Sequence, residues 1–140
     1  MTTPTAQILA NATVRTEQDL VQFWAALVGG DGFDRRTLWL VILDDDGRPA
    51  PTVVPVDDVP AAPSAADVDA FGQLLRHLEG FGLPVLLLSR PGPPSVQVHD
   101  RQWGRALAGF APRWPIHLAT QDASGRRVVT PLPPERAVRD

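Results

Sequence analysis

Apolar residues recur at helical spacing in three segments of the chain. The first stripe falls at positions i, i+3, i+4, i+7 and i+8 and consists of Leu20, Phe23, Trp24, Leu27 and Val28. This spacing is the apolar face of an amphipathic helix, and the preceding Thr16-Glu17-Gln18-Asp19 is typical of a capping box. Two further stripes contain Val68, Phe71, Leu74, Leu75 and Leu78, and then Trp103, Ala106, Leu107 and Phe110. The pattern predicts about three helices.

Short apolar runs between these helices predict five strands, at 37–43, 52–56, 85–88, 115–119 and 127–130. The first and third are continuous apolar runs, which are typical of strands buried on both faces. The second lies beside Pro51 and contains Pro55, and proline cannot donate to a strand ladder. We therefore expect this strand at an edge of the sheet.

The order of the elements predicts one α/β domain, with a mixed, partly parallel sheet flanked by about three helices. A chain of 140 residues, 44% hydrophobic and 21% charged, has the size and composition of one globular domain. We expect a flexible N-terminus at 1–13, the domain at 14–131 and a flexible tail at 132–140.

Residue types that are missing exclude several chemistries. The chain has no cysteine, so disulfides and thiolate metal sites are excluded. All 13 basic residues are arginine and there is no tyrosine, which excludes lysine Schiff bases and phenolic acid–base chemistry. The net charge of −3 argues against nucleic-acid binding. Without an apolar run of signal or membrane-spanning length, we expect a cytoplasmic protein that does not contact membranes.

Candidate metal sites are weak. Asp44-Asp45-Asp46-Gly47 resembles the start of a calcium loop but lacks its spaced ligands, which favours a hairpin turn. Asp57-Asp58 is a pair of adjacent carboxylates, more typical of a solvated loop than of a cation site. The histidines have no metal-ligand spacing. We expect His77 to be solvated and His117 to be a half-buried strand residue, although either could serve chemistry.

Candidate catalytic and ligand-binding residues follow the strand at 85–88. Ser89, His99 and Asp100 include the residue types of a nucleophilic triad, but there is no G-x-S-x-G elbow and His99 adjoins Asp100. Arg90 lies at a strand end, where ligands bind in open α/β sheets. With Arg101 and Arg105 it could hold a carboxylate or a phosphate. The alternative is an arginine that pairs with Asp100.

The segment from about Thr37 to Thr130 resembles the RadC branch of the JAB/MPN metalloprotease-like fold. The strand at 85–88 runs into Ser89-Arg90-Pro91, and Gly92-Pro93-Pro94-Ser95 and then Asp100 follow, as the family has a strand, a His-x-His-Pro motif, a proline-rich loop and a helix-starting Asp. Trp114-Pro115-Ile116-His117-Leu118 resembles the family's last motif strand, with Pro115 in the place of Asp.

The sequence departs from the family at the residues that carry out the family's chemistry. The resemblance places Leu88 and Arg90 at the two metal-binding histidines and leaves Asp100 as the one remaining ligand. One carboxylate cannot hold zinc, and leucine has no lone pair. Candidates for the family's general-base glutamate are Glu17, Glu79 and Glu135. An Arg90–Asp100 ion pair could replace the metal as the clamp between strand and helix.

The resemblance and its departures therefore imply a degenerate JAB/RadC-like pseudoenzyme without metal or cofactor, acting as a protein-interaction or scaffold domain. Its partner would be another protein or a second copy of the chain. Two alternatives stay open. One is a binding module for a small anion or chain terminus, built from Ser89, Arg90, Asp100, Arg101, Arg105 and His117. The other is an enzyme with a metal-free site that uses His99, Asp100 or His117.

Overall fold

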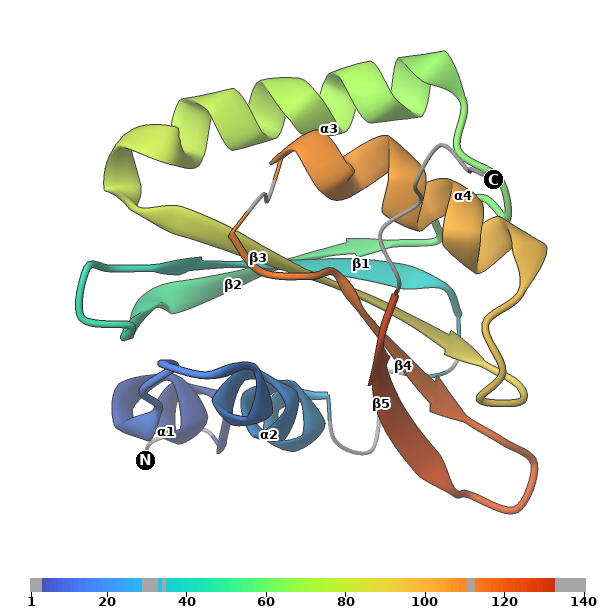
Figure 1. Ribbon diagram of the computed structural model, residues 1–140, viewed down its shortest axis with the longest axis horizontal. Coiled ribbons are helices and arrows are strands. Elements are labelled where there is room, and N and C mark those ends of the chain that lie inside the picture. Colours follow the sequence, from blue (N-terminus) through green and yellow to red (C-terminus); the bar gives the residue numbers. More distant parts are fainter. Residues whose placement is uncertain (1–3, 29–32, 34, 111–112, 133–140) are drawn as a thin grey trace.

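Five strands form one mixed sheet in the order β2-β1-β3-β4-β5, as Figure 1 shows. The computed structural model describes residues 4–28, 33, 35–110 and 113–132. The strands are β1 Thr37–Leu43, β2 Pro49–Asp57, β3 Leu83–Pro91, β4 His117–Gln121 and β5 Arg127–Pro131. The pair β3–β4 is parallel, and the other neighbouring pairs are antiparallel. The prediction of a mixed α/β fold is confirmed.

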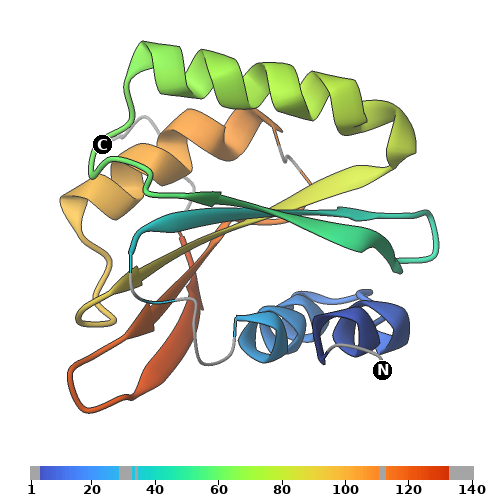
Figure 2. The same ribbon diagram turned by 180° about the vertical axis from the view of Figure 1, so that it is seen from behind.

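Two layers of helices enclose this sheet (Figures 1 and 2). The helices are α1 Pro4–Asn11, α2 Glu17–Leu27, α3 Ala65–Leu78 and α4 Val98–Leu107, with 3₁₀ turns η1 Glu79–Phe81 and η2 Ala108–Phe110. Helices α1 and α2 cover one face, and α3 and α4 cover the other. The described residues thus contain four α-helices rather than about three. None of them is long and apolar enough to cross a bilayer.

The additional helix is α1, which lies in the segment at 1–13 that we expected to be flexible. Its Leu9 is buried and belongs to the same core cluster as the apolar face of α2. An eight-residue helix is marginal by itself, so α1 depends on this tertiary contact. The predicted tail at 132–140 lies outside the described residues apart from Leu132. That residue is buried against the α4 face of the sheet, so the domain reaches past residue 131.

A local sequence signal starts α2 as predicted, and a similar one starts α3. At α2 the Asp19 N–H donates to Thr16 Oγ1 at 3.1 Å, and the Thr16 N–H donates to Asp19 Oδ2 at 3.2 Å, which completes a capping box. Ser64 and Asp67 make the equivalent exchange before α3. These contacts satisfy backbone N–H groups that have no partner within the helix.

The continuous apolar runs of β1 and β3 supply two separate cores. Alternate side chains of a strand point to opposite faces of the sheet. Val41 and Leu87 therefore lie in the cluster that α1 and α2 cover, whereas Leu40 and Leu86 lie in the cluster that α3 and α4 cover. Burial on both faces explains why these strands read as unbroken apolar runs rather than as alternating patterns.

Strand β2 lies at an edge of the sheet and is joined to β1 by a hairpin, as predicted. The Asp44 carboxylate organises the turn, because its Oδ1 accepts hydrogen bonds from the N–H groups of Asp46 and Arg48, both at 2.9 Å. Gly47 has a φ of +83°, a conformation that strains residues with a Cβ. The acidic sequence at 44–47 thus forms a hairpin turn, the alternative that its spacing favoured.

Candidate functional site at the end of strand β3

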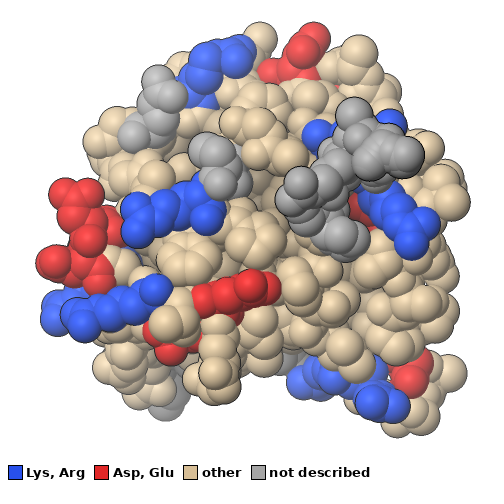
Figure 3. Space-filling model, in the orientation of Figure 1, with Lys and Arg blue, Asp and Glu red and all other residues tan. Residues whose placement is uncertain are grey.

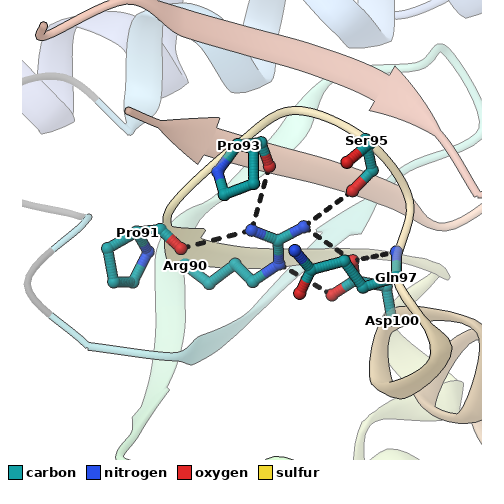
Figure 4. Close-up of polar contacts among 6 residues, drawn as sticks. All are labelled: Arg90, Pro91, Pro93, Ser95, Gln97 and Asp100. Atoms are coloured by element: carbon teal, nitrogen blue, oxygen red, sulfur yellow. Dashed lines mark hydrogen bonds and ion pairs between the residues drawn. The ribbon is translucent and has the colours of Figure 1, made fainter. Parts of the chain in front are cut away.

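The end of β3, the loop that follows it and the start of α4 meet around Arg90 (Figure 4). Strand β3 extends to Pro91, beyond the predicted 85–88, so Arg90 is a strand residue. It follows Leu86 and Leu88 on the face covered by α3 and α4. Asp100 lies in the first turn of α4, on the same side of the sheet. Their side chains are 3% and 0% exposed, so both charges are buried.

The Arg90 guanidinium donates five hydrogen bonds. Nε donates to Asp100 Oδ1 at 2.9 Å and Nη2 donates to Asp100 Oδ2 at 2.7 Å, which is a bidentate ion pair. Nη1 donates to the carbonyl oxygens of Pro91 and Pro93 at 3.2 and 3.1 Å. The second N–H of Nη2 donates to the carbonyl oxygen of Ser95 at 3.0 Å. An arginine has five N–H donors, so each has a partner within the chain.

Asp100 links the same cluster to the start of α4. In addition to the two contacts from Arg90, its Oδ2 accepts a hydrogen bond from the Gln97 N–H at 2.8 Å. A carboxylate in the first turn of a helix is also favoured by the helix dipole. The predicted Arg90–Asp100 ion pair is therefore present, and it joins strand, loop and helix.

The loop between β3 and α4 is fixed at a second point. Gly92 has a φ of +115°, and its N–H donates to the Gln121 carbonyl oxygen at the end of β4 at 2.9 Å. A Cβ at this position would lie 3.2 Å from Arg90 Nη1, so a side chain here would be both strained and crowded. Glycine thus lets the loop close over the guanidinium.

These residues do not fit the metal that the resemblance implies. Leu88 and Arg90 lie on one face of β3, toward the helix that carries Asp100, as a shared ligand set would require. However, leucine has no lone pair, the guanidinium stays protonated, and both oxygens of Asp100 already accept hydrogen bonds. Within the described residues no group of three or more His, Asp or Glu side chains is placed to hold a metal.

The residue types of a catalytic triad are separated by the fold. Ser89 lies on the opposite face of β3 from Arg90 and is buried, and its Oγ accepts a hydrogen bond from Trp39 Nε1 at 2.8 Å. His99 is exposed on α4, where its Nδ1 lies 3.1 Å from Gln102 Oε1. Ser89 therefore does not share a face of the sheet with His99 and Asp100.

His117 is fully buried rather than half-buried, and it lies on the face covered by α1 and α2. Its Nδ1 is 3.1 Å from the Pro115 carbonyl oxygen, and its Nε2 is 3.3 Å from Glu17 Oε2. Burial lowers the pKa of His117 below its ordinary value, while the charge and hydrogen bond of Glu17 act in the opposite direction. The sheet separates this pair from Arg90 and Asp100. Of the other glutamates considered, Glu135 lies outside the described residues.

Arg101 and Arg105 do not join Arg90 in one anion site. Both lie on the exposed side of α4, whereas the Arg90 guanidinium is buried and its donors are occupied. On the face drawn in Figure 3, basic side chains form separate small groups with carboxylates between them. The cluster of three arginines expected from the sequence is therefore divided between a buried residue and a solvated helix surface.

The remaining candidates lie apart from this site. His77 is exposed, as predicted, with its Nδ1 2.8 Å from the Gln73 carbonyl oxygen. Asp58 has a φ of +60° and pairs with Arg35 at 2.9 Å, in an exposed contact. The carbonyl oxygens that bind Arg90 could not be predicted from the sequence, because every residue type has the same backbone carbonyl group.

No family model, curated protein or solved structure matches this chain.

Proposed function

We propose that the chain is a non-catalytic, JAB/RadC-like interaction or scaffold domain of the cytoplasm, in which an arginine–carboxylate pair replaces a metal-dependent hydrolytic site. The supporting observation is the use of the Arg90 side chain. All five of its donors bind Asp100 or the loop that follows β3. A residue used in this way holds structure and has no donor left for a substrate.

The surface that this pair stabilises is suited to protein interaction. Pro91, Pro93 and Pro94 are exposed, and Val98 at the start of α4 is 63% exposed. The Arg90 side chain holds the loop by hydrogen bonds to its carbonyl oxygens, and the prolines restrict its backbone further. A surface that is ordered before binding loses less conformational entropy when a partner docks. We propose a protein partner or a second copy of the chain at this loop.

The anion-binding alternative is weaker because its central residue, Arg90, is already neutralised by Asp100. An enzyme that uses His99 or His117 is weaker because these residues lie on opposite faces of the sheet. Neither alternative has an observation that favours it over the interaction domain.

Restoring the family's metal ligands tests the proposed ancestry. Leu88→His with Arg90→His places two imidazoles on the face of β3 toward Asp100 and frees its carboxylate. We expect this variant to bind about one Zn²⁺ per chain by calorimetry and to melt at higher temperature with zinc. Leu88→His with Arg90→Met, with one imidazole, is the control. If the double-histidine variant folds but does not bind zinc, the JAB/RadC assignment is refuted.

Site-specific photo-crosslinking tests the interaction role. A benzophenone side chain at Pro94, in cells that naturally make the protein, should form a defined adduct with a partner. The same group at Asp45 is the control, since the β1–β2 turn lies at the Leu83 end of β3, away from Pro91. The Pro94 adduct should weaken with Arg90→Met and persist with Arg35→Met. Equal adducts at both positions, or none at Pro94, would exclude this loop as the interaction surface.

A further inference from the structure

A second surface with the character of a binding site lies on the α3–α4 face, at the same end of the sheet as the loop after β3 but lined by other residues. It is a groove of about 310 Å³ between the N-terminal half of α3, the end of β2 and the link at 59–60. This volume is at the lower end of the range for ligand pockets, so it suits one or two side chains.

The floor of the groove is apolar and rigid. Leu38, Phe71 and Trp103 are nearly fully buried beneath it. Trp103 Nε1 donates to the Pro60 carbonyl oxygen at 3.0 Å, which holds the link against α4. Half-buried Val56 extends the apolar lining toward the end of β2. An apolar side chain that enters the groove would therefore meet a preformed surface.

The groove contains carboxylates and no basic residue in its described lining. Asp57, Asp58 and Asp67 contribute to it. Asp58 pairs with Arg35 in an exposed contact. The Asp57 carboxylate accepts a hydrogen bond from Thr37, its partner across the β1–β2 ladder, so it points to the α1–α2 face and not into the groove. Asp67 accepts hydrogen bonds at Oδ2, from Ser64. Among the described residues, this leaves Oδ1 of Asp58 and Oδ1 of Asp67 for a ligand.

We infer that this groove binds an extended segment of a partner protein in which an arginine or lysine adjoins an apolar residue. The apolar side chain would contact the floor beside Phe71 and Trp103, and the cation would face Asp58 and Asp67. Long basic side chains suit such a site, because their aliphatic stems lie along apolar surface while the charge reaches the carboxylates. An acidic segment would meet uncompensated negative charge and would be repelled.

This inference rests on the proposed role in protein interaction, but it concerns a separate surface. The crosslinking at Pro94 and the zinc binding of the histidine variant do not involve the groove. If no peptide binds in the groove, the crosslinking and zinc results still stand. If the crosslinking or the zinc binding fails, a positive result at the groove still stands.

Nuclear magnetic resonance of the ¹⁵N-labelled full chain provides the test, with acetyl-Leu-Arg-Leu-amide as the probe. We expect saturable shifts of the Trp103 indole N–H and of the amides of Val59 and Ala70. Acetyl-Leu-Glu-Leu-amide should bind at least about fivefold more weakly, the factor that corresponds to ~1 kcal/mol. If the Trp103 signal does not respond to the arginine peptide, the groove is not the site.

Matched variants separate the charge from the fold. Asp58→Asn with Asp67→Asn should weaken the binding of the arginine peptide by about fivefold or more, the loss that corresponds to ~1 kcal/mol, while Asn retains oxygens for the Arg35 and Ser64 contacts. Asp69→Asn is the control, because Asp69 is exposed on the same helix but outside the lining. Equal binding of the arginine and glutamate peptides, or equal effects of the two Asp variants, would overturn the cation assignment.

One further variant tests whether the chain fills its own groove. The segment after Leu132 contains Arg136, Val138 and Arg139, so it has arginines beside an apolar residue as the inferred ligand does, together with Glu135 and Asp140. In the full-length chain, Arg136→Gln with Arg139→Gln should leave the affinity for the arginine peptide unchanged. If the peptide binds this variant but not the parent, the occupant is the chain's own C-terminal segment and the inference of a partner is overturned.

Discussion

Breaking the Arg90–Asp100 pair should show that it is a structural clamp rather than a surface contact. The perturbation is a double-mutant cycle with Arg90→Met and Asp100→Asn. Methionine keeps much of the arginine stem but removes all five donors, and asparagine keeps the shape of the aspartate but removes its charge. The cycle isolates the interaction between the two side chains from their other contacts.

The structure indicates the size of the effect. Both side chains are at least 97% buried, since they are 3% and 0% exposed, and two charge-assisted hydrogen bonds of 2.9 and 2.7 Å join them. Removing one partner leaves a buried charge, which typically costs about 3–5 kcal/mol. The double variant leaves no unpaired charge and should cost about as much as either single variant. We therefore expect a coupling free energy of ~2 kcal/mol or more.

Urea unfolding, followed by circular dichroism, measures the free energy of unfolding of the parent, the two single variants and the double variant. The chain contains a matched control in Arg35–Asp58, which has the same 2.9 Å contact but side chains that are 55% and 68% exposed. The corresponding cycle there, Arg35→Met with Asp58→Asn, should give a coupling below ~1 kcal/mol. Effects of Arg90→Met and Asp100→Asn that add within ~0.5 kcal/mol would refute the clamp.

Three further predictions concern the cores, the hairpin and the buried histidine. Leu86→Ala should lower the free energy of unfolding by ~2–5 kcal/mol in urea, and an unchanged midpoint would contradict its place in the core. Gly47→Ala should lower the melting temperature more than Gly125→Ala. Both glycines have positive φ, but only at Gly47 would a Cβ also clash with backbone atoms, those of Val14. Equal losses in melting temperature would contradict this contact. Because burial lowers the pKa of His117, the unfolded chain binds the proton first as the pH falls below about 6.5, and stability decreases there. Glu17→Gln should steepen that decrease in urea titrations across the pH range, and an unchanged slope would show that the pair is not coupled.

The strands could be predicted because the local sequence alone indicates that they are buried. A strand covered on both faces needs apolar side chains at successive positions, and the segment at 37–43 has them. Helix α1 could not be predicted in the same way. Its eight residues make little more than two turns, which is short for a helical period to be recognised, and the burial of Leu9 depends on α2, which the sequence of residues 4–11 does not encode.

The candidate site could be predicted in part. Arg90 and Asp100 are close in the sequence, and a strand followed by a loop and a helix brings them together. The contacts of Arg90 with Pro93 and Ser95 depend on the path of the loop, which residue types alone do not define. The contact between His117 and Glu17 spans 100 positions and arises only when the sheet and α2 are assembled.

The division of the interior into two cores has a consequence for synthesis. Helices α1 and α2 are made first, but their apolar side is covered by strands that come later, including β3. The ribosome adds roughly 55 residues between Leu27 and Leu83, which takes about 3–11 s. During this interval the cluster around Leu20 and Trp24 lacks the residues that β3 and β4 supply, Val85, Leu87 and Ala119, and is open to chaperones and to aggregation. Nascent chains arrested before β3 emerges should be cleaved by protease within α2, and chains arrested after the sheet has formed should resist.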